Sequence, residues 1–328
     1  MLNKLALLAI SGAALLLAGC GSTEKDADTT GASTSSGDKP KFKITVSLPA
    51  ADHGWVAGAI WWAEEGKTKH AADAEITIQT ADSPGKQVND LETMMATKPD
   101  AMVVLATESK PLTPVAKKIH DAGILLVNVD RGFDEPVADL FIQGDNKGFG
   151  RVAAEFIAEK LGGKGNILVL EGVPCTVNTD RNTAFQEVMK GFPDIKILDS
   201  QPGDWRKDKA LNVTQTMLVK HPEVNAIWAA DDDMALGAEQ ACKEAGKKDI
   251  WIVGGGGMKD IVKRIMDGDP RFPATVTYSP KMVGDAIDRA VEMLKKKEKP
   301  TSQKDETINV TLVKPDNAKD HYYPKSVY

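Results

Sequence analysis

The sequence predicts an α/β protein built from two lobes, each a doubly wound parallel sheet. From Phe42 onward, short apolar runs alternate with longer amphipathic stretches of helical length. Strand followed by helix, repeated along the chain, is typical of parallel sheets that carry helices on both faces. The apolar runs number about eleven, more than one open sheet of this kind usually holds, so we expect two sheets.

The predicted strands are short runs rich in Val, Ile and Leu, as expected of strands buried between helices. In chain order they span 42–48, 75–79, 101–106, 124–129, 139–143, 166–171, 195–198, 226–230, 250–254, 274–278 and 308–313. The stretches of helical length between them span 55–72, 84–97, 111–122, 147–161, 181–191, 207–220, 233–245, 258–267 and 280–297. Pro111 and Pro114 begin one of these helices, and Gly123 and Gly246 directly follow the last turns of two.

Residues 1–20 are predicted to be a lipoprotein signal peptide. Lys4 supplies a short positive region, and residues 5–17 are almost wholly apolar. A run this short indicates a signal peptide, because a membrane-spanning helix needs roughly 20 apolar residues. The ending Leu-Ala-Gly-Cys resembles a bacterial lipobox, which implies cleavage before Cys20 and attachment of lipid to its thiol. The alternative is an ordinary signal peptide with a chance cysteine.

Residues 21–40 are predicted to be a flexible tether. They contain no large apolar side chain and are rich in Ser, Thr, Gly and Asp. Such a segment cannot bury enough surface to offset the entropy lost on ordering. We therefore expect a folded part that starts near Phe42 and is held by lipid at the periplasmic or extracellular face of the cell membrane.

Composition and charge exclude several classes of partner. Hydrophobic residues make up 42% and charged residues 27%, as in an ordinary globular protein. The net charge is −6, and no stretch combines Lys and Arg with interleaved aromatic residues, so we expect no nucleic-acid partner. The basic run 295–299 is interpreted as the solvated end of a helix near its negative dipole end, which leaves the lipid anchor as the only membrane contact.

No cofactor or metal is predicted. The run Gly254–Gly257 follows a predicted strand but lacks the G-x-G-x-x-G spacing of a dinucleotide site. No CxxC, HExxH or clustered Cys/His pattern indicates a metal site. Cys175 and Cys242 are expected to be free thiols, although the sequence leaves open whether they pair.

Candidate ligand-binding residues follow the predicted strands. In open α/β sheets, ligands bind outside the carboxyl ends of the strands. The residues found there, or at the next helix, are Asp52, His53, Trp55, Glu108, Asp130, Arg131, Arg181, Trp205, Asp231 and Tyr278. Carboxylates accept hydrogen bonds from hydroxyls, guanidinium groups donate in a planar fork, and indoles cover apolar faces. The set therefore predicts a site for a hydroxyl-rich small molecule.

A structural role competes with this interpretation for each residue alone. An Asp at the end of a strand is often only the N-cap of the next helix. Asp232 or Asp233 is expected to fill that role before Met234.

The chain resembles the periplasmic sugar-binding proteins of ABC importers, in the ribose-binding-protein group. The resemblance covers essentially all of 41–315. It is carried by ordered segments: VSLPAADHGW at 46–55, LLVNVDRG at 125–132, IQGDNKGFGRVAAEFI at 142–157, LVLEG at 168–172, QPGDWRKDKALNVTQ at 201–215, PEVNAIWAADDDMALGA at 222–238 and TVTYSP at 275–280. The lipobox and the absence of a helix-turn-helix segment separate it from repressors of the same fold.

This resemblance implies a type I periplasmic binding protein fold, in which three crossovers join two lobes that close on a sugar. The N-terminal lobe would comprise 41–143 plus 280–302, and the C-terminal lobe 144–279 plus 303–328. It also implies a monomer that delivers its ligand to the permease of an ABC transporter.

By position, Trp55 and Trp205 would stack on the sugar, and Tyr278 would lie at a hinge. Sugar binders of this group usually carry Asp where this chain has Gly256, so the resemblance implies a lost hydroxyl acceptor there. The glycines would make room for a larger sugar, or for a polyol contacted by Glu108. Two alternatives stay open: a receptor subunit for a sugar-like signal, and a lipid-anchored α/β enzyme acting on a carbohydrate.

Overall fold

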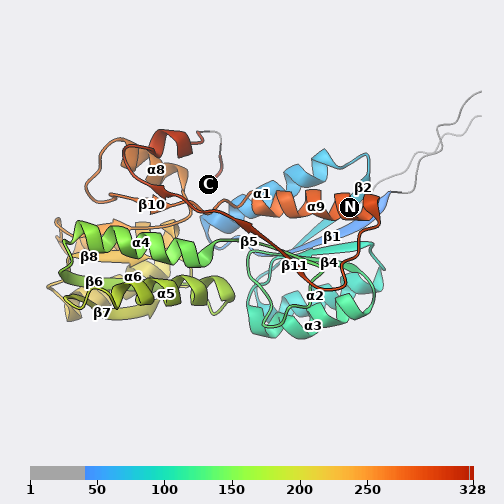
Figure 1. Ribbon diagram of the computed structural model, residues 1–328, viewed down its shortest axis with the longest axis horizontal. Coiled ribbons are helices and arrows are strands. Elements are labelled where there is room, and N and C mark those ends of the chain that lie inside the picture. Colours follow the sequence, from blue (N-terminus) through green and yellow to red (C-terminus); the bar gives the residue numbers. More distant parts are fainter. Residues whose placement is uncertain (1–40, 325) are drawn as a thin grey trace, which may run out of the picture. The chain divides into compact units, whose positions relative to one another are not determined.

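A six-stranded parallel sheet forms the centre of one lobe, here called the N-lobe (Figure 1). The computed structural model describes residues 41–324 and 326–328, so the predicted signal peptide, Cys20 and the tether lie outside the described residues. The strands are β1 (Phe42–Pro49), β2 (Ala74–Ala81), β3 (Ala101–Val104), β4 (Leu125–Val129), β5 (Leu140–Gly144) and β11 (Lys304–Ile308), in the order β11-β5-β4-β3-β1-β2. All five pairings are parallel.

Helices cover both faces of this sheet. On one face, α1 (Gly54–Lys69) packs against α9 (Met282–Lys296), and on the other α2 (Pro84–Ala96) packs against α3 (Ser109–Asp121) (Figure 1). Every residue of β3 and β4 is buried, which explains why these central strands appear in the sequence as unbroken apolar runs.

The other lobe, here called the C-lobe, is built on a four-stranded parallel sheet in the order β7-β6-β8-β9. Its strands are β6 (Gly165–Glu171), β7 (Ile195–Pro202), β8 (Ala226–Ala229) and β9 (Trp251–Val253). Its helices are α4 (Asn146–Lys160), α5 (Thr176–Met189), α6 (Lys207–Lys220), α7 (Asp232–Glu244) and α8 (Lys259–Met266). In the core, the rings of Phe185 and Trp228 stack with centroids 3.9 Å apart.

The chain passes between the two sheets three times. It crosses from β5 into α4, from β10 (Thr275–Val276) into α9, and from β11 into β12 (Leu312–Val313). β10 and β12 form a small antiparallel pair, followed by the 3₁₀ turn η1 (Ala318–His321). The predicted α/β class with two parallel sheets and three crossovers is confirmed.

One predicted boundary is wrong. Residues 303–328 were assigned to the C-terminal lobe, but β11 pairs in parallel with β5 in the sheet of the N-lobe. The predicted strand 308–313 is accordingly divided between β11 and β12. β11 has the sequence KDETI and lies at the edge of the sheet with no fully buried residue, so no apolar run indicates where it pairs.

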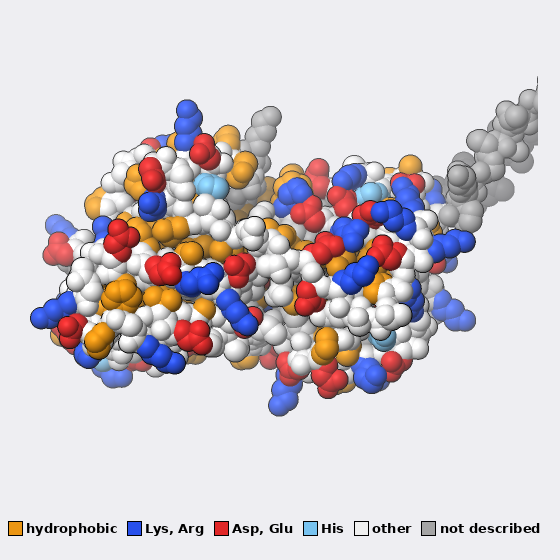
Figure 2. Space-filling model, in the orientation of Figure 1, with side chains coloured by type: hydrophobic (Ala, Val, Ile, Leu, Met, Phe, Trp, Pro, Cys, Tyr) orange, Lys and Arg blue, Asp and Glu red, His pale blue; other side chains and the backbone are white. Residues whose placement is uncertain are grey.

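The cysteines, the hydrophobicity of the helices and the surface charge can also be described. Cys175 and Cys242 are both free and buried. Within 41–324 and 326–328, no helix is long and apolar enough to cross a membrane. Figure 2 shows acidic and basic side chains interspersed over one face of the molecule.

Candidate functional site

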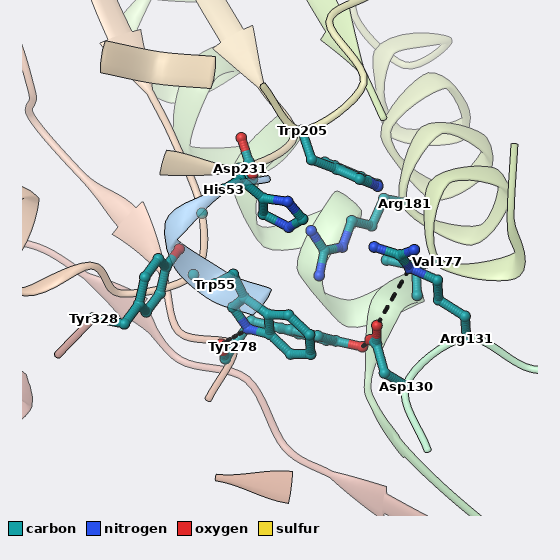
Figure 3. Close-up of a pocket in the computed structure, with 12 residues that line it drawn as sticks. His53, Trp55, Asp130, Arg131, Val177, Arg181, Trp205, Asp231, Tyr278 and Tyr328 are labelled. Carbon is teal, nitrogen blue, oxygen red and sulfur yellow. Dashed lines mark hydrogen bonds and ion pairs between the residues drawn. The ribbon is translucent and has the colours of Figure 1, made fainter. Parts of the chain in front are cut away.

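A small cavity lies where the carboxyl ends of the strands in both lobes meet (Figure 3). The lining residues are His53, Trp55, Asp130, Arg131, Val177, Arg181, Trp205, Asp231, Gly255, Gly256, Tyr278 and Tyr328. The position fits the rule that open α/β sheets bind ligands beyond the carboxyl ends of their strands.

Eight of the ten residues singled out from the sequence line this cavity. The structure places Asp52 and Glu108 outside it, at a neighbouring hollow that shares His53, Arg131 and Trp205 with it. Asp52 Oδ1 lies 2.6 Å from Nδ1 of His53. Burial raises the pKa of the Asp52 carboxyl, but the hydrogen bond and charge of His53 outweigh burial and lower that pKa overall.

Asp130 is the most connected carboxylate of the cavity. It follows β4 with φ of 66°, a left-handed conformation that is uncommon outside glycine and that often marks functional positions. Its Oδ1 accepts a 2.7 Å hydrogen bond from the Tyr278 hydroxyl, and its Oδ2 lies 3.7 Å from Nε of Arg131 (Figure 3). Burial raises the pKa of Asp130, and the charge of Arg131 and the Tyr278 hydrogen bond oppose that rise.

Backbone carbonyls hold the guanidinium group of Arg131. One terminal nitrogen of Arg131 donates to the carbonyl oxygens of Ala106 and Thr107, at 3.3 and 2.8 Å. Because a guanidinium group has five N–H donors, this anchoring leaves donors free for a ligand in the cavity.

Arg181 comes from inside α5. The sequence placed it at the start of a helix at 181–191, but α5 begins at Thr176, so Arg181 lies in its second turn. Its Nε donates to Asn146 Oδ1 at 3.0 Å, and a terminal nitrogen donates to the Ala230 carbonyl at 2.6 Å. The guanidinium carbon lies 4.2 Å from the ring centroid of Tyr278 and 5.6 Å from that of Trp205. Cation–π contacts and hydrogen bonds therefore fix a buried charge at the cavity wall.

Aromatic rings form two opposite sides of the cavity. Figure 3 shows Trp205 on one side and Trp55 with Tyr278 on the other. The Trp55 indole N–H donates to the Tyr278 carbonyl at 2.8 Å, which leaves its ring as an apolar surface. Trp205 has φ of 62° and directly follows Asp204, which has φ of 55°. A Cβ atom at Gly172 would lie 1.8 Å from Trp205 Cζ2, so this indole fits only because residue 172 has no side chain.

Three consecutive aspartates have three different environments. The N-cap of α7 is Asp231, whose Oδ1 accepts from the Met234 N–H at 2.8 Å, so the prediction that Asp232 or Asp233 fills that role is wrong. Burial, reinforced by the charge of Asp233, raises the pKa of Asp231 well above its ordinary range. Asp231 alone of the three lines the cavity.

Asp232 and Asp233 serve the structure around the cavity. Asp232 is fully buried and accepts from the Met258 N–H and the Thr275 hydroxyl, both at 2.8 Å. Burial raises its pKa to about 7. Asp233 Oδ2 accepts from the Gly54 N–H at 3.0 Å, and this hydrogen bond joins the C-lobe to the N-lobe.

Sequence reasoning missed Val177 and Tyr328, which line the cavity, and Asn146, which bonds to the lining residues Arg181 and Tyr278. Val177 is an ordinary apolar residue in the first turn of α5, and no pattern marks it. Asn146 begins α4 and donates to the Tyr278 hydroxyl at 3.2 Å. Its position directly after β5 and Asp145 is the signal that would have found it, because it too lies at the carboxyl end of a strand.

The arrangement offers hydrogen-bond acceptors and donors around the edge of a space with aromatic sides. Carboxylates come from Asp130 and Asp231, and guanidinium groups from Arg131 and Arg181. No group of three or more His, Cys, Asp or Glu side chains is placed to hold a metal ion within the part of the chain that the structure describes.

The chain is similar in sequence and fold to known binding proteins. The family described as periplasmic binding protein domain matches residues 44–299. The galactofuranose-binding protein YtfQ of Escherichia coli (strain K12) is 32% identical over 297 residues, which cover 86% of this chain and 91% of that protein. The ribose import binding protein RbsB of Bacillus subtilis (strain 168) is 28% identical over 260 residues, 79% of this chain and 83% of that protein. A crystal structure of a galactofuranose binding protein matches with a TM-score of 0.81 and 28% identity, covering 88% of this chain and 100% of that one.

Proposed function

The chain belongs to the periplasmic binding protein domain family, and we propose that it captures a sugar or polyol between its lobes and delivers it to an ABC importer. The family consists of extracytoplasmic solute-binding proteins rather than enzymes. The family match confirms the resemblance to periplasmic sugar-binding proteins that the sequence indicated. It also argues against the carbohydrate-acting enzyme that the sequence left open.

The observation that carries this proposal is the pairing of aromatic sides with a charged edge in one cavity. A monosaccharide or polyol presents C–H surfaces on its faces and hydroxyls around its edge. Trp205 faces Trp55 across the cavity, and both indoles are more than nine-tenths buried. Such rings cover apolar faces and exclude water from the hydrogen bonds beside them.

The edge residues supply matching polar groups. Asp130 and Asp231 would accept hydrogen bonds from ligand hydroxyls, while Arg131 and Arg181 would donate to ring or hydroxyl oxygens. Hydroxyl donors would stabilise the ionised form of both carboxylates, which burial disfavours in the protein alone. Asp52 and Glu108 would contact only a ligand that extends beyond the cavity into the neighbouring hollow.

The proposal includes lipid anchoring at Cys20. Its support is the apolar run that ends in Leu-Ala-Gly-Cys, together with the polar tether at 21–40. Mass spectrometry of the mature protein should find a diacylglyceryl cysteine at its N-terminus. An unmodified N-terminal residue at another position would contradict the anchor and leave the ligand-binding proposal intact.

Ligand capture is tested by a thermal-shift screen over aldopentoses, aldohexoses, pentitols and inositols, followed by calorimetry on the compounds that stabilise the protein. A ligand at 100 times its dissociation constant stabilises the folded state by about 2.7 kcal/mol. The bound compound should be recovered chemically unchanged after prolonged incubation. Failure of every compound to bind, or recovery of a converted product, would overturn the proposal.

A further inference from the structure

The side chain of Tyr328 lies at the cavity, although no pattern in the sequence indicates it. Tyr328 lines the cavity together with Trp55, Asp231 and Gly256, and it is only 6% exposed (Figure 3). Two hydrogen bonds hold the backbone beside it: Lys259 Nζ donates to the Ser326 carbonyl at 2.8 Å, and the Tyr328 N–H donates to Ser326 Oγ at 3.1 Å.

Glycines in both lobes leave space for this side chain. A Cβ atom at Gly256 would lie 2.0 Å from the Tyr328 hydroxyl oxygen, so no larger residue at 256 is compatible with this position of the tyrosine. In α1, added Cβ atoms at Gly54 and Gly58 would lie 3.2 and 3.1 Å from Tyr328 atoms. The sequence led us to expect empty space at Gly256, but the phenol of Tyr328 occupies it.

The Tyr328 hydroxyl is buried without a hydrogen-bond partner among the described residues. An unsatisfied buried hydroxyl is unfavourable, and a ligand that pairs with it removes that cost. Burial and the charges of Asp232 and Asp233 raise the pKa of Tyr328 well above its ordinary range, so the phenol stays protonated and can donate. Its position at the cavity wall makes a bound ligand the natural partner.

We infer that Tyr328 contacts the bound ligand and that its hydroxyl selects ligands carrying an oxygen beside Gly256. This inference rests on the proposed function and adds a residue and a specificity to it. A sugar or polyol hydroxyl at that place would satisfy the phenol and be satisfied by it. A ligand lacking that oxygen would leave the phenol unpaired and bind more weakly.

The test compares Tyr328→Phe with Tyr323→Phe, a matched control in the same segment whose side chain is 64% exposed. The probe is the compound from the sugar and polyol panel that the wild type binds most tightly, together with its monodeoxy analogues. We expect Tyr328→Phe to weaken binding of the parent compound by about 5- to 100-fold, and Tyr323→Phe to change it less than about twofold.

One monodeoxy analogue should bind wild type and Tyr328→Phe equally well, because it lacks the oxygen that pairs with the phenol. The ligand-free Tyr328→Phe variant should melt at the same temperature as the wild type or higher, since the change removes an unpaired polar group and keeps the ring. A merely structural role would instead lower both the melting temperature and every affinity. If Tyr328→Phe binds the parent compound as tightly as the wild type does, this inference alone is overturned. If the wild type binds none of the compounds, the proposed function is overturned and this inference with it.

Discussion

The Tyr278 hydroxyl donates a 2.7 Å hydrogen bond to Asp130 Oδ1, and this bond joins a crossover between the lobes to the end of β4. The same hydroxyl accepts from Asn146 Nδ2 at 3.2 Å, at the start of α4. Three segments that are far apart in the sequence therefore meet at one phenol. The contact fixes one oxygen of the Asp130 carboxylate, whose other oxygen lies 3.7 Å from Arg131 Nε, at the wall of the cavity.

Asp130→Asn should weaken ligand binding by about 10- to 200-fold, equivalent to roughly 1.5–3 kcal/mol for a lost bond to a charged acceptor. Asn is the appropriate replacement because it tolerates the left-handed backbone that Asp130 adopts. Calorimetry measures the change. Asp121→Asn is the control, since Asp121 is more than half exposed in a surface ion pair and should leave affinity unchanged. Equal affinity of Asp130→Asn and wild type would place the ligand elsewhere.

The burial of strands explains which parts of the fold could be predicted. β3 and β4 are buried throughout, so their apolar runs stand out from the helices around them. β11 could not be found by this signal, because its residues are polar and its place depends on hydrogen bonds to β5. Edge strands of this kind are defined by backbone pairing that the side-chain pattern does not encode.

In the site, too, some residues could be predicted from the sequence and others could not. Asp130, Arg131 and Trp205 follow strands and could be predicted from the rule for open α/β sheets. The sequence could not show which of Asp231, Asp232 and Asp233 is the N-cap of α7, because three identical residues in a row do not mark where the helix begins. Tyr328 follows no strand or helix period, and its place depends on how the chain after η1 returns across Gly256.

Gly172→Ala should weaken binding without removing any atom that faces the cavity. The new methyl group would collide with the Trp205 ring at 1.8 Å and displace the indole. Its effect on affinity should therefore approach that of Trp205→Ala when both are measured by calorimetry. Gly85→Ala is a suitable control, because nothing lies within 4 Å of an added Cβ there. If Gly172→Ala binds the ligand as tightly as the wild type does, the position of Trp205 does not matter for binding.

Thr176→Val should raise the ligand dissociation rate. The Thr176 hydroxyl oxygen, in the C-lobe, accepts a 2.9 Å hydrogen bond from the Gly132 N–H, in the N-lobe. We expect this bond to break when the lobes separate to admit a ligand, so its loss should disfavour only the closed form. A lost hydrogen bond of about 0.5–1.5 kcal/mol corresponds to roughly a 2- to 13-fold change.

Stopped-flow measurement of ligand release provides the test of Thr176→Val. Thr179→Val is the matched control, because the Thr179 hydroxyl bonds to the Cys175 carbonyl within the C-lobe. Equal release rates in the two variants would mean that the bond to Gly132 does not contribute to closure.

Asp232 should make the folded protein less stable as the pH rises from about 4 to about 7. Its pKa is raised from an ordinary value of 3.8 to about 7 by burial, so the folded state holds this proton more tightly than the unfolded state. Stability from the protonated carboxyl is therefore complete below pH 4 and is lost as the pH rises through the folded pKa. The shift corresponds to a loss on the order of 4 kcal/mol above pH 7.

Asp232→Asn isolates this contribution, because Asn cannot ionise and can keep both hydrogen bonds. Its Oδ1 can accept from the Met258 N–H while its Nδ2 donates to the Thr275 hydroxyl, which reverses only the direction of the second bond. Urea unfolding at pH 5 and pH 8 should show a smaller loss of stability in the variant than in the wild type. The remaining loss would come from Asp130, Asp231 and Asp233, whose pKa values burial also raises. The same difference between pH 5 and pH 8 in both proteins would mean that Asp232 is ionised in the folded state at both.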